Sequence, residues 1–109
     1  MSVVSFCRFK TTTAVLLEIQ RLADELSTDN KRYAALLTEA MALTDYWADL
    51  TSHTDWSSDQ KSLREFDTRL RLFREDTRLF QEDLEAEAAK RRAIEEEQAL
   101  YQGLLRFAS

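Results

Sequence analysis

The stretch LREFDTRLRLFREDTRLFQEDL, residues 63–84, decides the fold of this chain. Its apolar residues recur at steps of three and four, which places them on one side of an α-helix. The members of this seam are Leu63, Phe66, Leu70, Phe73, Phe80 and Leu84, with Thr77 as its one polar position. We therefore predict a long helix with one apolar seam.

The same spacing continues in both directions along the chain. Towards the C-terminus the seam weakens, because charged or polar residues share it with Ile94, Tyr101 and Leu105. Towards the N-terminus a second seam runs through Val15, Ile19, Leu22, Leu26, Asp29, Tyr33, Leu36, Ala40, Leu43, Trp47 and Leu50. This second seam predicts one helix from about Thr12 to Thr51.

A turn between the two seams is predicted at residues 52–58, where small polar residues cluster. Ser57, followed three residues later by Gln60, fits a capping box that begins the second helix. Folding the chain there matches the seams, so Leu50 faces Leu63 and both chain ends lie at the far tip. The prediction is an all-α, coiled-coil-like antiparallel two-helix hairpin forming a single domain over residues 1–109.

Two parts of this prediction stay open. Residues 27–30 read Ser-Thr-Asp-Asn, a sequence typical of helix caps, so a three-helix arrangement with a break there is the alternative. Residues 1–11 either extend the first helix, pack near Phe107 or stay flexible.

The composition excludes several classes of protein. The chain of 109 residues holds one glycine, no proline and one cysteine. Folds rich in β-hairpins need glycine and proline at their turns, and phosphate-binding loops need several glycines. A single thiol also forbids a disulfide framework within the chain.

Charge and hydropathy limit the expected partners and location. The net charge of −5 disfavours nucleic acid, because acidic chains repel phosphate. No stretch approaches the roughly 18 consecutive apolar residues of a membrane span, so we expect no membrane insertion. The N-terminus does not fit a secretory signal. The expected location is the cytoplasm, or export together with a partner.

Catalytic, metal and cofactor sites are not expected. His53 is the only histidine and lies in the predicted turn, while Cys7 lies at the opposite tip of the hairpin. The chain has no inward Glu-x-x-His motif of the kind that di-iron bundles use. We therefore expect a protein that is not an enzyme and binds no cofactor.

A second apolar row on the second helix predicts a partner-binding surface. This outer row lies about 200° around the helix from the seam and repeats every seven residues, at Leu72, Leu79, Ala86, Ala93, Leu100 and Phe107. Exposed apolar rows of this length usually mark a protein interface. The predicted partner-binding residues are Leu72, Leu79, Ala86, Ala93, Leu100, Leu104 and Phe107, with Leu16, Leu37 and Met41 from the first helix. The alternative is that a third segment of the same chain covers them.

The layout resembles a known family. About a hundred residues, two helices and Trp56 in the turn resemble the Trp-Xaa-Gly helical hairpins of type VII secretion and the small helical proteins that accompany LXG-toxin effectors. Trp56-Ser57-Ser58 lacks the glycine of that motif, and Leu105 stands at the acidic position of the Tyr-xxx-Asp/Glu signal that would start at Tyr101. The resemblance implies a helper that pairs with a secreted helical partner.

The leading functional hypothesis is thus a non-catalytic adaptor or chaperone that binds a helical client. One alternative is a structural subunit of a permanent coiled-coil assembly or a homodimer. Others are a chaperone of the type III secretion kind, and an acidic regulator that acts by surface mimicry.

Overall fold

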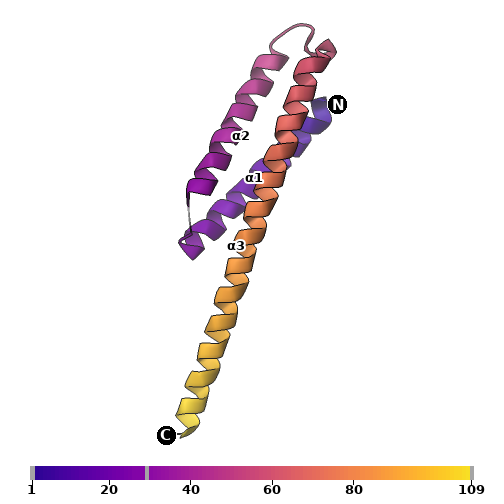
Figure 1. Cartoon of the computed structure of the whole chain (residues 1–109). Helices are drawn as coiled ribbons and strands as arrows, with labels where there is room; N and C mark the ends of the chain where they lie inside the picture. The colour runs from indigo at the N-terminus through magenta and orange to yellow at the C-terminus, as the bar shows by residue number, and fades with distance from the viewer. Residues whose placement is uncertain (1, 29, 109) are drawn as a thin grey trace.

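The chain is all-helical in a computed structural model that describes residues 2–28 and 30–108, with side chains from residue 8 onward. Its elements are α1 (Ser2–Leu26), α2 (Asn30–Thr51), the short 3₁₀ helix η1 (Trp56–Ser58) and α3 (Gln60–Ala108). α1 runs down the molecule, α2 returns beside it, and α3 runs down again past both (Figure 1). The all-α prediction is confirmed, and the described part of the chain contains no strand.

The helix expected over residues 12–51 is divided in two, as in the three-helix alternative. Ser27 adopts a left-handed backbone conformation with φ 54°. Its N–H donates to the carbonyl of Asp24 at 3.3 Å, and the N–H of Thr28 donates to the carbonyl of Ala23 at 3.1 Å. This pair of bonds is a Schellman motif, which ends a helix and turns the chain away from its axis. Asp29, the polar seam position, lies outside the described residues.

Replacing Ser27 with glycine should stabilise the protein. A left-handed conformation costs a residue with a Cβ atom roughly 1 kcal/mol or more, whereas glycine adopts it freely. We expect thermal unfolding followed by circular dichroism to show a midpoint about 4–8 °C higher. Ser27→Ala keeps the Cβ atom and should give no such gain. An unchanged midpoint for Ser27→Gly would show that the Schellman turn carries no strain.

α3 begins two residues later than the predicted capping box implies. The carboxylate of Asp59 accepts a hydrogen bond from the N–H of Ser62 at 3.1 Å, so Asp59, not Ser57, caps the helix. That bond to the backbone holds the pKa of Asp59 below its ordinary value. Residues 56–58 form η1, in which the Trp56 ring packs edge-on against Trp47 at 5.8 Å between centroids. The aromatic contact closes the turn between α2 and α3.

The predicted seam of α3 is buried from Leu63 to Leu84. α2 covers this seam through Leu36, Ala40, Leu43 and Leu50, as the hairpin prediction required. α1 folds back and covers it as well: Phe9, at the start of the described side chains, packs against Phe73 with ring centroids 6.4 Å apart. The core is therefore shared by three helices. Its buried apolar residues from α1 are Phe9, Leu16, Ile19 and Ala23.

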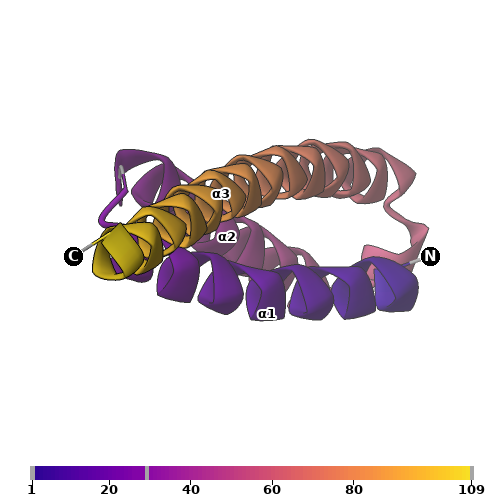
Figure 2. The ribbon, with the colours of Figure 1, turned by 90° about the horizontal axis from the view of Figure 1, so that it is seen from below.

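α3 is about twice as long as its neighbours and projects beyond them. It has 49 residues, against 25 in α1 and 22 in α2. Residues 89–108 are all exposed, and we call this segment the arm. The arm leads away from the other helices in Figure 1 and stands in front of them in Figure 2. α3 as a whole accounts for most of the 78 Å length of the molecule. The expectation that both chain ends meet is wrong, because α1 begins at the end of the molecule where α3 starts, far from the end of the arm (Figures 1 and 2).

Candidate protein-binding surface

The outer row predicted on α3 is exposed along its whole length. Leu72 and Leu100 each retain about two thirds of their surface, at 64% and 65%, and Phe107 retains 94%. Leu79, Ala86, Ala93 and Leu104 are exposed as well. Neither α1 nor α2 covers this side of α3. The row is thus an apolar strip that the described part of the chain leaves in water.

The first-helix residues assigned to the same surface do not join it. Leu16 was expected to be exposed, and this is wrong: it is 2% exposed within the core. The reason is the break at Ser27, which folds α1 back as a third helix against α3. Leu37 and Met41 are exposed on α2. Helical geometry places them roughly opposite the side of α2 that borders the outer row.

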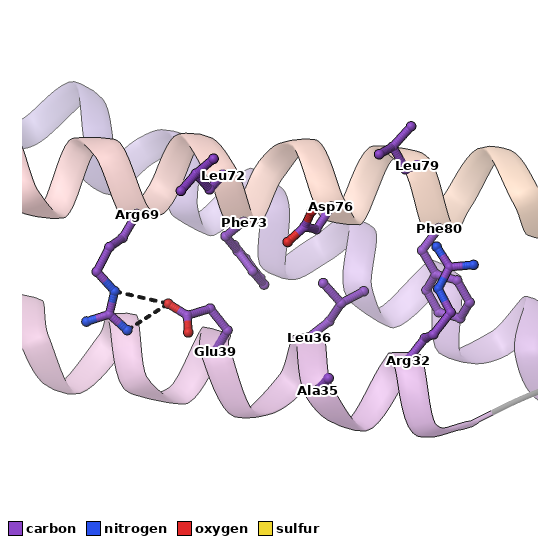
Figure 3. Close-up of a pocket in the computed structure, with 10 residues that line it drawn as sticks. All are labelled: Arg32, Ala35, Leu36, Glu39, Arg69, Leu72, Phe73, Asp76, Leu79 and Phe80. Atoms are coloured by element: carbon purple, nitrogen blue, oxygen red, sulfur yellow. Dashed lines mark hydrogen bonds and ion pairs between the residues drawn. The ribbon is translucent and has the colours of Figure 1, made fainter.

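A groove between α2 and α3 runs beside the upper part of the outer row. Its volume is about 610 Å³, and Leu36, Phe73 and Phe80 are among its apolar lining residues. Leu72 and Leu79 rise from α3 on the side away from α2 and form one rim of the groove (Figure 3). The groove therefore widens the apolar strip where the three helices pack together.

Two ion pairs join α2 to α3 at this groove. The guanidinium of Arg69 donates to Glu39 at 2.7 and 3.2 Å (Figure 3). The guanidinium of Arg32 donates to Asp83 at 2.8 Å and lies 4.6 Å from the centre of the Phe80 ring. All four side chains remain partly in water, so these pairs add little stability. Their effect is to place charges of both signs along the edge of an apolar surface.

Several charged residues of α3 pair with residues outside α3, although acidic residues four positions away on α3 would also allow pairs within the helix. Arg69 contacts Glu39 of α2. Arg91 donates to the carbonyl of Glu25 at 3.4 Å, and Glu87 accepts from the hydroxyl of Thr28 at 3.0 Å. Arg78 pairs within α3, with Glu82 at 2.6 Å. Arg78 also binds Glu75, whose pKa it holds below the ordinary value.

Comparison with known proteins found no match for this chain. No protein-family model matches the chain, no curated protein matches its sequence, and no solved structure matches its fold. Among the described residues no three His, Cys, Asp or Glu side chains gather where they could hold a metal ion. Within the same residues no helix has the length and apolar character needed to cross a membrane. The surface must therefore be interpreted from its own geometry.

The arm carries exposed apolar residues beyond those of the outer row. Ile94, Tyr101 and Leu105 were assigned to the seam and expected to pack against the first helix, but they are more than half exposed. Because the chain breaks at Ser27 and α1 and α2 both pack on the first part of α3, no described segment covers them. They lie beside Leu100, Leu104 and Phe107, so apolar residues occupy much of one face of the arm, which Glu97 interrupts. We call these six residues the arm face.

The signal for the arm face was present in the sequence. Glu87, Arg91 and Gln98 occupy seam positions beyond Leu84, and a seam buried within one chain rarely places charged residues there. The weakening begins where burial ends, since Leu84 is the last buried residue of α3. Trp56, assigned to the turn motif, is half-buried against Trp47 and has a structural contact there.

Proposed function

We propose that this chain is a non-catalytic binding protein, an adaptor or chaperone that holds a helical partner against the exposed apolar surface of α3. The observation that carries the proposal is the projecting arm. Residues 89–108 extend beyond the core while their arm face remains uncovered. An isolated helix of this length is only marginally stable in water, so a partner that buries the arm face would also stabilise the helix.

The chemistry of the surface favours a protein helix as the partner. The apolar strip is long and narrow, and it follows the axis of α3 rather than closing around a small ligand. Amphipathic helices bind such strips through apolar side chains spaced three and four residues apart. Acidic residues interrupt its edges, including Asp76, Asp83 and Glu97, which disfavours nucleic acid and anionic lipid as ligands.

The resemblance to type VII secretion helpers supplies a candidate class of client, a secreted helical effector. In that setting the bundle of α1, α2 and the first half of α3 would act as a rigid holder. The arm would reach along the client and cover its apolar surface until delivery.

Site-specific photo-crosslinking in the producing cells tests the proposal. A photoreactive phenylalanine at Leu104 should form a covalent product with a protein partner, because Leu104 lies on the arm face. The matched control is the same group at Gln102, which is also exposed on the arm but points away from the arm face. Equal yields at the two positions, or no product at Leu104, would contradict a binding role for this surface.

A further inference from the structure

We infer that a partner of the outer row is a second copy of this chain, paired antiparallel along α3. The inference rests on the proposed function, since it uses the same surface, and it names that partner. Its starting point is the symmetry of the outer row, Leu72, Leu79, Ala86, Ala93, Leu100 and Phe107. These positions are equally spaced about a midpoint between Ala89 and Lys90.

The row is therefore complementary to itself when one copy is turned end over end. A two-fold axis at the midpoint brings Leu79 next to Leu100 of the second copy, and Leu72 next to its Phe107. The small residues Ala86 and Ala93 meet at the centre, where the two helices can approach most closely. Interfaces of two-fold dimers require this reciprocity, in which residue i contacts residue j and residue j contacts residue i.

The structure leaves room for a second α3 along the whole row. The end of α1 lies against Ala88, Arg91 and Glu95, which are on the other side of α3 from the row. α2 borders the row only at the groove, whose rim is Leu72 and Leu79. In the antiparallel pair, Leu100, Leu104 and Phe107 of one arm lie beside that groove in the other copy. Each arm thereby gains a partner for part of its arm face.

The charges beside the row oppose this pairing only in part, because an arginine lies at each place where acidic residues of the two copies meet. Glu97 of the second copy falls opposite Asp83, and Arg32 is already bound to Asp83 at 2.8 Å. Glu96 of the second copy falls opposite Glu82, which Arg78 binds at 2.6 Å. Both places where acidic residues meet thus contain an arginine from the same copy. The Lys90 residues of the two copies meet at the axis, where their long side chains can extend away from each other into water.

The extent of the pairing agrees with a stable dimer. The row spans residues 72–107, about 50 Å of helix in each copy at 1.5 Å per residue. With its flanking positions and the rim of the groove, it approaches the roughly 20 residues per partner found in specific interfaces. A helical client that used the same strip would compete with the second copy.

The mass of the purified full-length chain, measured by light scattering, gives the first test. We expect a dimer. Leu79→Ser should raise its dissociation constant by about 100-fold or more, because each dimer loses two copies of the contact. Leu17→Ser is the control, since Leu17 is an exposed leucine on α1 away from the row, and it should leave the dimer intact. A monomer at every concentration would overturn the inference. A photo-crosslink from Leu104 to a different protein would then still support the proposed function.

Disulfide trapping tests the orientation in a Cys7→Ser background. Ala86→Cys and Ala93→Cys chains should cross-link when mixed under mild oxidation. Neither should cross-link with itself, because antiparallel pairing separates identical positions by about 10 Å along the axis. A disulfide needs Cα atoms within about 4–7 Å. Efficient self-linking of each variant would indicate a parallel dimer and overturn the antiparallel assignment.

Discussion

Phe66→Ala is expected to lower the free energy of unfolding by about 3–5 kcal/mol. Phe66 is fully buried, with its ring 5.1 Å from that of Trp47 and 5.9 Å from that of Tyr46, measured between centroids. Alanine would remove these contacts and leave a cavity where α2 packs on α3. Domains of this size are stable by only about 5–15 kcal/mol, so the substitution removes a large part of the total.

Denaturant unfolding followed by circular dichroism measures this loss. Leu72→Ala is the matched control, because Leu72 lies on the same helix but is exposed. At a concentration where the chain is monomeric, this control should change the free energy of unfolding by less than about 0.5 kcal/mol. Similar effects of the two substitutions would contradict the assignment of Phe66 to the core.

Replacing three residues of the arm face with serine should abolish partner binding without unfolding the core. The variant is Leu100→Ser, Leu104→Ser and Phe107→Ser. Each side chain contributes about 1.5–3 kcal/mol when fully buried, so losing all three should weaken binding by roughly a thousandfold or more. Titration calorimetry against the partner identified by cross-linking measures the effect.

The control for this variant lies on the other side of the arm. Arg92→Ser, Gln102→Ser and Arg106→Ser change three exposed residues that point away from the arm face. Binding should remain within a few-fold of the wild type. In both variants the unfolding midpoint of the monomer should stay close to that of the wild type, because the buried part of α3 ends at Leu84. Equal losses of affinity in the two variants would contradict the assignment of binding to the arm face.

The predicted helices were largely correct because apolar spacing is a local property of the sequence. The seam from Leu63 to Leu84 is buried as expected, and α2 packs against it in the predicted antiparallel direction. The break at Ser27 was kept only as an alternative. The left-handed conformation that ends α1 is usually adopted by glycine, so a serine at that position gave no clear stop signal.

The binding surface was predicted in part. The exposure of Leu72, Leu100 and Phe107 followed from their distance around the helix from the seam. The burial of Leu16 and the exposure of Ile94 could not be predicted in the same way. Both depend on which segment covers which face of α3, and local spacing cannot determine a long-range contact.

The sequence by itself determined that the chain is helical, which residues share a face of each helix, and that α3 carries two apolar faces. These follow from the spacing of the apolar residues, because residues three and four positions apart lie on the same side of an α-helix. Only the tertiary structure decided that α1 turns back at Ser27 and packs beside α3. That fold covers the first half of α3 with two helices and leaves the arm bare, because a chain divided into 25- and 22-residue helices is too short to reach its end.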